Sequence, residues 1–191
     1  MRLIAASPAA SVWRLQYRPN LSTSMIGQVD ASVGGKVAVN AKTAKNLYGA
    51  FHHPSHVAAD PELLATLGAR DFRSGIAEAI KVAILDSESL FARIENDLPT
   101  LRALRADAFR TVAFEAARLK MERIDQDPYE EDLRRPLNLG HTLGHPIETD
   151  YCYQGVRHGE AVGIGMAVAA WIAFHRRQLT SQDRTRILDL L

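Results

Sequence analysis

Apolar residues recur every three or four positions over most of the chain beyond residue 60. This spacing places them on one face of an α-helix, which buries that face against its neighbours. It predicts helices around residues 76–84, 90–98, 106–124, 137–148 and 161–175, and a last helix that begins at residue 184. The C-terminal two-thirds of the chain is therefore predicted to be a mainly α-helical bundle.

Polar and turn-forming residues mark the ends of several predicted helices. Asp60 followed by Pro61 is typical of an N-cap with a proline at the first helical position. The Asp-Pro pair at 127–128 predicts the end of the 106–124 helix, and Asn138 is expected to cap the helix over 137–148. The apolar run over 161–174 is too short to span a bilayer, so we interpret it as a buried helix.

The first sixty residues carry weaker periodic signals. Residues 26–40, centred on the Gly-Gly-Lys sequence at 34–36, predict a loop with short extended or helical pieces. A helix is expected to start at the Lys-Asn pair at 45–46. The proline of His-His-Pro at 52–54 predicts a turn or an extended stretch.

Composition narrows the class of protein. The 191 residues are 47% hydrophobic and 24% charged, with a net charge of +1, as in ordinary globular enzymes. This balance predicts neither a nucleic acid nor a membrane as a partner. Cys152 is the only cysteine, which excludes an intrachain disulfide and a cysteine-rich zinc site. Residues 1–10 make a poor secretory signal, so a cytoplasmic location is expected.

Histidines concentrate in one segment of the chain. His141 and His145 are four residues apart and share a helical face, and Glu148 adds a carboxylate one turn further on. His158 begins a His-Gly-Glu sequence ten residues later. Imidazole and carboxylate groups bind zinc-like metals and also transfer protons near neutral pH. The segment therefore predicts an active site.

Glu78, His141 and His158 are the first candidate constellation. Two imidazoles and one carboxylate form a ligand set that leaves a metal position open for water or substrate. The three residues are far apart in sequence, so their types alone leave two alternatives open. They could meet at a metal, or each histidine could cap a helix or bond a carbonyl group.

A glycine-rich segment and scattered basic residues are weaker signals. The Gly-Gly-Lys sequence that ends at Lys36 lets backbone approach a ligand closely, but it matches neither a Walker A loop nor a dinucleotide fingerprint. Lys81, Lys120 and Arg134 become anion-binding candidates only if they lie near the histidines. Otherwise they are interpreted as ordinary surface residues.

Five ordered blocks of sequence resemble the C-terminal part of the 3-dehydroquinate synthases, which belong to the sugar phosphate cyclase superfamily. The blocks are residues 28–36, 45–51, 66–67 with 75–81, 134–145, and 158–162. The resemblance implies a cyclase of the shikimate pathway that converts a heptulosonate phosphate into a carbocycle with loss of phosphate. It also implies NAD, a divalent metal (zinc, with cobalt as the alternative), a sugar phosphate substrate, a carbon–oxygen lyase and a homodimer.

The resemblance also assigns roles to individual residues. It implies three metal ligands: Glu78, His141 and His158. It implies six catalytic, substrate-contacting residues: Lys36, Lys81, Lys120, Arg134, Asn138 and His145. It implies six residues that line the NAD site: Thr23, Ser24, Asp30, Lys45, Asn46 and Thr66.

The fold implied is the mainly α, multi-helix C-terminal domain of a dehydroquinate synthase-like protein. Residues 1–22 are expected to be an irregular remnant of the α/β nucleotide-binding domain. Residues 23–191 are expected to form the helical metal- and substrate-binding domain, incomplete at its C-terminus. Pro146 departs from the family, which commonly has a small residue there, and a proline inside a helix costs about 3 kcal/mol.

Three alternatives stay open. Residues 127–136 are more similar to cyclases of secondary metabolism, which favours a valiolone-type synthase acting on a sedoheptulose or hexose phosphate. The chain could be an inactive truncated fragment that lacks the NAD domain. The third alternative is a metal-dependent hydrolase or an iron-type alcohol dehydrogenase, although the segment from Asp30 to Lys36 favours a cyclase.

Overall fold

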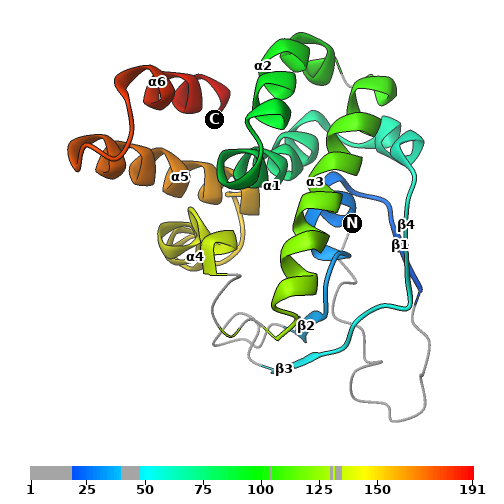
Figure 1. Cartoon of the computed structure of the whole chain (residues 1–191). Helices are drawn as coiled ribbons and strands as arrows, with labels where there is room; N and C mark the ends of the chain where they lie inside the picture. The colour runs from blue at the N-terminus through cyan, green and yellow to red at the C-terminus, as the bar shows by residue number, and fades with distance from the viewer. Residues whose placement is uncertain (1–18, 40–47, 104, 130, 132–134) are drawn as a thin grey trace.

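The computed structural model describes residues 19–39, 48–103, 105–129, 131 and 135–191, and these form mainly helices (Figure 1). The helices are α1 (Ala69–Asp86), α2 (Glu88–Arg102), α3 (Ala106–Gln126), α4 (His141–Asp150), α5 (His158–His175) and α6 (Ser181–Leu190). The mainly α fold class is thereby confirmed. In Figure 1, α1, α2 and α3 lie at the centre, with α4, α5 and α6 on one side of them.

Four short strands lie on the other side of the central helices. β1 (Pro19–Ser22) pairs in parallel with β4 (His56–Ala59), and β2 (Lys36–Val39) pairs antiparallel with β3 (Tyr48–Phe51). A π-helical turn, η2 (Gly27–Ala31), connects β1 to β2. Buried Gln28 in this turn donates to the carbonyl of Ser22, at 3.1 Å, and to that of Asp60, at 2.7 Å. These bonds hold the turn against the carboxyl-terminal end of the β1–β4 pair.

The main hydrophobic core lies between α1, α2 and α3. The rings of Phe72 and Phe109 pack with their centroids 4.2 Å apart, and Ile94 and Val112 are fully buried. The apolar stripes predicted from helical spacing supply Ile94, Phe109 and Val112, whereas Phe72 lies before the helix predicted at 76–84. Their burial supplies most of the favourable free energy of folding in this region.

Several predicted boundaries are confirmed. The Asp60 side chain accepts from the N–H of Glu62 at 3.0 Å, with Pro61 next to it, although the element is a short 3₁₀ helix, η3 (Pro61–Thr66). The third helix ends before Asp127, as expected. The helix start predicted at 45–46 lies outside the described residues.

The start of α4 differs from the prediction. Asn138 lies in a 3₁₀ turn, η4 (Arg135–Asn138), and does not cap the helix, which begins at His141. Gly140 separates the two elements because its φ of 81° is left-handed and interrupts the helical path. A Cβ atom there would lie 2.5 Å from the carbonyl oxygen of Val162 on α5, so glycine also permits the close contact of α4 with α5.

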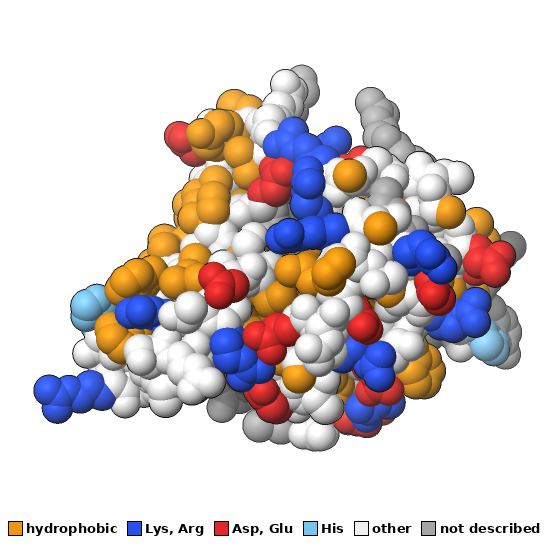
Figure 2. Space-filling model, turned by 90° about the horizontal axis from the view of Figure 1, so that it is seen from above, with side chains coloured by type: hydrophobic (Ala, Val, Ile, Leu, Met, Phe, Trp, Pro, Cys, Tyr) orange, Lys and Arg blue, Asp and Glu red, His pale blue; other side chains and the backbone are white. Residues whose placement is uncertain are grey.

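The interpretation of residues 161–174 as a buried helix is wrong for one face of α5. Val162 and Met166 are buried, but Ile164 and Ile172 are about half exposed, at 51% and 49%. The reason is that α1, α4 and α6 cover α5 from one side only within the described part of the chain. Figure 2 shows the exposed apolar side chains gathered along one edge of the molecule, over α5 and α6. No described helix has the length and apolar character needed to cross a membrane.

Candidate active site

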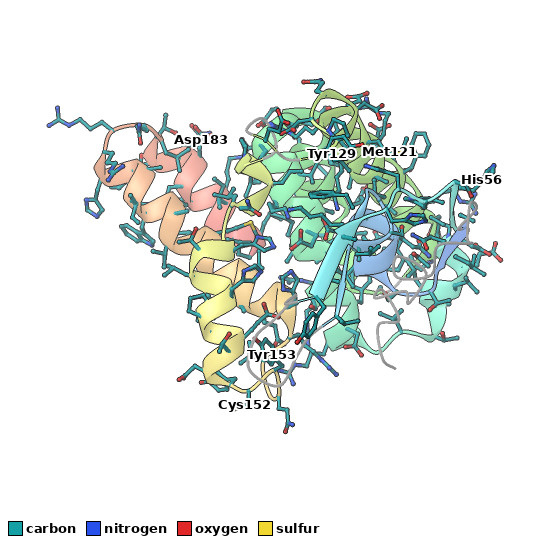
Figure 3. The ribbon with its side chains drawn as sticks, turned by 90° about the horizontal axis from the view of Figure 1, so that it is seen from below. His56, Met121, Tyr129, Cys152, Tyr153 and Asp183 are labelled. Carbon is teal, nitrogen blue, oxygen red and sulfur yellow. The ribbon has the colours of Figure 1, made fainter. Side chains whose placement is uncertain are left out.

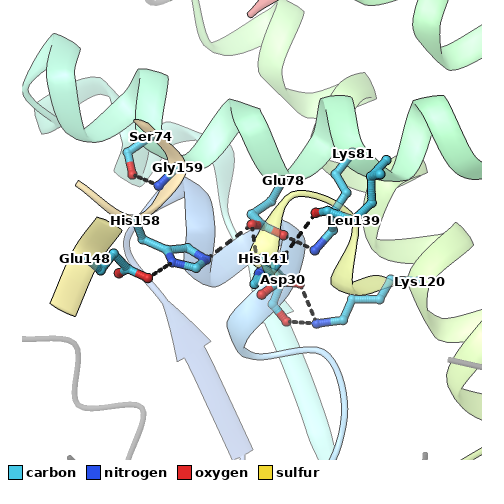
Figure 4. Close-up of polar contacts among 10 residues, drawn as sticks. All are labelled: Asp30, Ser74, Glu78, Lys81, Lys120, Leu139, His141, Glu148, His158 and Gly159. Atoms are coloured by element: carbon cyan, nitrogen blue, oxygen red, sulfur yellow. Dashed lines mark hydrogen bonds and ion pairs between the residues drawn. The ribbon is translucent and has the colours of Figure 1, made fainter. Parts of the chain in front are cut away.

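Glu78, His141 and His158, the Glu-His-His triad, come together from three helices (Figure 4). Glu78 lies in the middle of α1, while the two histidines are the first residues of α4 and α5. One ligand atom from each lies within 4.8 Å of those of the other two. Nε2 of His158 is 3.3 Å and Nε2 of His141 is 3.7 Å from Oε1 of Glu78.

This arrangement fits a divalent metal. Oε1 of Glu78 is buried and accepts no hydrogen bond of normal geometry from the described residues, and the groups that face it are the two imidazole nitrogens. Ligands held about 2.0–2.1 Å from a tetrahedral zinc ion lie roughly 3.3 Å from one another. The two distances from Glu78 are close to that value, and an ion placed among the three atoms would satisfy the unpaired oxygen.

The remaining nitrogen of each histidine is held by an acceptor. Nδ1 of His141 lies 3.1 Å from the carbonyl of Leu139, and Nδ1 of His158 lies 3.0 Å from Oε2 of buried Glu148. A carbonyl or carboxylate oxygen can only accept, so Nδ1 carries the hydrogen in both rings. In the neutral rings this leaves the lone pair on Nε2, which faces Glu78.

The protonation states of the triad differ. Burial and the charge of Lys81 lower the pKa of His141 to about 4, so its imidazole is neutral at pH 7. Burial would lower the pKa of His158, but the nearby carboxylates of Glu148 and Glu78 raise it to about 9. Burial and Asp30 would raise the pKa of Glu78, but the Lys81 ammonium and His158 outweigh them and keep Glu78 ionised.

Two lysines predicted at substrate positions lie beside the triad. The ammonium of buried Lys81 donates to Oε2 of Glu78. Lys120, on α3, donates to Oδ1 of Asp30 at 2.7 Å and to its carbonyl at 2.6 Å. Burial would raise the pKa of Asp30, but Lys120 and Lys81 hold it well below its usual range. The lysines and carboxylates therefore form neighbouring ion pairs.

His145 also lies in this cluster. Its ring centroid is 5.1 Å from that of His141 and 6.2 Å from that of His158. Asn138 and Lys36 are exposed, the first in η4 and the second at the start of β2. Arg134 lies outside the described residues.

The residues predicted to line an NAD site lie on other elements. Thr23 and Ser24 lie between β1 and η2, where the Ser24 hydroxyl accepts from the N–H of Gly27 at 3.2 Å. Thr66 is exposed in η3 and donates to the carbonyl of Leu63 at 3.2 Å. Asp30 lies in η2 beside Lys120. Lys45 and Asn46 are outside the described residues, and all six roles stay predictions.

Sequence reasoning missed the residues that hold the start of α5. Ser74 and Arg70 lie four and eight residues before Glu78 on α1, and both contact the first turn of α5. Their spacing of four residues places them on the same helical face as Glu78, and this spacing could have been recognised in the sequence. A Cβ atom on Gly159 would lie 1.8 Å from the carbonyl oxygen of Ser74, so only glycine permits this approach.

Comparison with protein families finds two matches that together cover most of the chain. Residues 4–74 match the model described as 3-dehydroquinate synthase N-terminal, and residues 75–191 match 3-dehydroquinate synthase C-terminal. The chain is 44% identical to a 2-epi-valiolone synthase of Actinosynnema mirum over 172 residues, which are 90% of this chain and 45% of the relative. It is 42% identical to a 3-dehydroquinate synthase of Pelotomaculum thermopropionicum over 188 residues, which are 98% of this chain and 51% of the relative. The chain thus spans about half the length of the curated relatives it matches.

Solved structures agree with this assignment. The structure of ValA, a 2-epi-5-epi-valiolone synthase from Streptomyces hygroscopicus subsp. jinggangensis 5008 with NAD+ and Zn2+ bound, matches with a TM-score of 0.88 and 35% identity. The matched region covers 95% of this chain and 51% of the ValA chain. A 2-deoxy-scyllo-inosose synthase complexed with carbaglucose-6-phosphate, NAD+ and Co2+ matches with a TM-score of 0.85 and 28% identity, over 96% and 50%. Because the C-terminal family model matches residues 75–191, more than half of the chain and all three members of the Glu-His-His triad, the chain belongs to the 3-dehydroquinate synthase family.

Proposed function

We propose that this chain provides the metal- and substrate-binding helices of a sugar phosphate cyclase. The first candidate reaction is that of a 3-dehydroquinate synthase, a phosphate-eliminating carbon–oxygen lyase that turns a heptulosonate phosphate into a carbocycle. The observation that carries the proposal is the unpaired buried oxygen of Glu78, which faces two imidazole nitrogens. A homodimer and a cytoplasmic location remain predictions from the family resemblance.

The charges of the site favour an anionic substrate once a metal is bound. Three carboxylates balance three cations without metal: Asp30, Glu78 and Glu148 against Lys81, Lys120 and the imidazolium of His158. A divalent cation that displaces the His158 proton raises the net charge by one. The site would then attract the phosphate and carboxylate groups of a sugar acid phosphate.

The cofactors would supply the reactive steps, and the chain's residues would position the substrate. A divalent ion held by Glu78, His141 and His158 would supply Lewis-acid chemistry at a substrate hydroxyl, and NAD would supply the redox chemistry of the reaction. Lys81 and Lys120 would hold anionic groups of the substrate, and His145 would contact the phosphate or transfer a proton.

A valiolone-type synthase is the second candidate. The observation that favours it is the 44% identity of this chain to the 2-epi-valiolone synthase. The identity to a 3-dehydroquinate synthase is nearly the same, at 42%, so sequence identity does not separate the two candidates. The two substrates differ in charge, since a heptulosonate carries a carboxylate that a sedoheptulose lacks.

Phosphate release tests the proposal. The purified protein is assayed with zinc, NAD and, in separate reactions, a heptulosonate phosphate, a sedoheptulose phosphate and a hexose phosphate. Release from the first alone supports the 3-dehydroquinate synthase reaction, and release from one of the others supports the second candidate. Glu78→Gln should abolish release, while Glu122→Gln on the exposed surface of α3 should leave it unchanged. No release from any substrate would overturn the proposed activity.

A further inference from the structure

Helix α1 carries three polar residues on one face, and each contacts the beginning of α5. The α1 stripe consists of Arg70, Ser74 and Glu78, spaced four residues apart. Glu78 faces Nε2 of His158, the first residue of α5. The other two residues contact the backbone and side chains on either side of that histidine.

Ser74 bonds directly to the first turn of α5. Its hydroxyl accepts from the backbone N–H of Gly159 at 2.9 Å, and both residues are buried. This N–H is one of the donors at a helix N-terminus that lack a partner within the helix. The bond therefore fixes the residue that follows His158 to the helix that carries Glu78 (Figure 4).

Arg70 holds the same turn at two further points. Its Nε and Nη2 lie 2.6 Å from the two carboxylate oxygens of Glu160, and Nη2 also donates to the carbonyl of Gly155. Glu160 in turn accepts from the N–H of Arg157 at 2.9 Å. Arg70 is thus joined to residues before and after His158.

The loop that precedes His158 has a further contact with α1, because Nε of Arg157 lies 3.1 Å from Oδ1 of Asp71. It follows α4 and contains Cys152 and Tyr153, both with left-handed φ values, of 51° and 57°, and Figure 3 shows them at the far end of α4. Each residue of a helix is rotated about 100° from the previous one and rises 1.5 Å. A small rotation or slide of the first turn of α5 would therefore turn Nε2 of His158 away from Glu78.

We propose that Arg70 and Ser74 are positioning residues for the metal site. They set the rotation and height of the first turn of α5, so that His158 presents Nε2 to Glu78 while Glu148 holds Nδ1 from α4. The inference rests on the proposed function, because it assumes that the Glu-His-His triad binds a metal. Because the Arg70 side chain is half exposed, its ion pair with Glu160 adds little to the free energy of unfolding. Its role is to position the first turn of α5.

Cobalt titration of the purified protein tests this inference. Co2+ reports affinity through its d–d absorption and reports ligand geometry through the shape of that spectrum. The variants are Arg70→Ala, Arg70→Lys and Ser74→Ala. The matched control is Arg186→Ala, because Arg186 forms a similar two-point ion pair with Glu95 between α6 and α2, away from the triad.

The expected result separates geometry from stability. Arg70→Ala and Ser74→Ala should each weaken Co2+ binding about tenfold and alter the spectrum, with Arg70→Lys recovering part of the affinity. Arg186→Ala should keep the wild-type affinity and spectrum even if it unfolds more easily. In the metal-free protein, the 15N chemical shifts of the His158 ring should move in the first two variants and not in the control.

Three outcomes would overturn the inference. Wild-type affinity, spectrum and ring shifts in Arg70→Ala and Ser74→Ala would refute the positioning role while leaving the metal site intact. Equal losses in Arg186→Ala would assign the effect to general stability. Absence of Co2+ binding by the wild-type protein would refute the proposed metal site itself, and the positioning role with it.

Discussion

Replacing Glu148 by glutamine should change how zinc affinity depends on pH. The substitution keeps the size of a buried side chain on α4 but removes the charge that lies 3.0 Å from Nδ1 of His158. Glutamine can still accept a hydrogen bond, so the ring should stay near its position. What changes is the stabilisation of the imidazolium and the basicity of Nε2.

The pKa of His158 sets the expected magnitude. Its rise from 6.5 to about 9 corresponds to about 3 kcal/mol in favour of the protonated ring. At pH 7 only about one ring in a hundred is then neutral, so proton competition lowers zinc affinity about 100-fold below its value above pH 9. Without the Glu148 charge, the His158 pKa should fall back from about 9 toward its ordinary value. As pH increases, the zinc affinity of the variant should therefore reach its plateau at a lower pH than that of the wild type. The plateau affinity should be about 10- to 100-fold weaker than in the wild type.

Two measurements check this prediction. Zinc affinity is measured between pH 6.5 and 9.5 in chelator-buffered solutions, and the His158 pKa is measured by 15N NMR in the metal-free protein. Asp150→Asn, an exposed change on the same helix, is the control and should behave as wild type. A His158 pKa and an affinity profile that are unchanged in Glu148→Gln would refute the reasoning.

Three further predictions concern stability and are measured by urea unfolding. Lys81→Met should destabilise the metal-free protein by about 3–5 kcal/mol, because it removes the ammonium that pairs with the buried carboxylate of Glu78; a loss below 1 kcal/mol would contradict this. Gly159→Ala should cost at least about 3 kcal/mol because of the contact at 1.8 Å, whereas Gly163→Ala, with open space around the added carbon, should be neutral or stabilising by about 0.5–1 kcal/mol. Asp30→Asn should destabilise at pH 7 but progressively less below pH 4, because the pKa of Asp30 in the folded state lies below its ordinary value of 3.8 and its stabilisation is lost as the carboxylate is protonated. An effect of Asp30→Asn that is the same at pH 7 and pH 2.5 would exclude this linkage.

The fold was predictable where local patterns decide it. The apolar spacing over 106–124 and the Asp-Pro pair after it predicted α3 closely, because a helix and its end depend on nearby residues. The start of α4 was not predictable from Asn138, since the left-handed Gly140 and its contact with Val162 depend on where α5 lies. The exposed face of α5 also eluded pattern reasoning, because an apolar sequence does not indicate which neighbours cover it.

The candidate site was predictable in its residue types and not in its geometry. Histidines at 141, 145 and 158 indicated an active site. Residue types made Glu78, His141 and His158 a candidate ligand set, and the family resemblance implied the same three residues. Spacing alone could not distinguish the roles of His145 and Glu148, which share a helical face with His141. The structure separates them through contacts between helices, because Glu148 bonds Nδ1 of His158 across the α4–α5 contact.

An anomalous-difference map from zinc-loaded crystals tests the central claim most directly. The account predicts one strong peak bound by Oε1 of Glu78 and by Nε2 of His141 and His158, at about 2.0–2.2 Å from each. A zinc peak bound to other residues, or none at these three in protein that holds one equivalent of zinc, would contradict it.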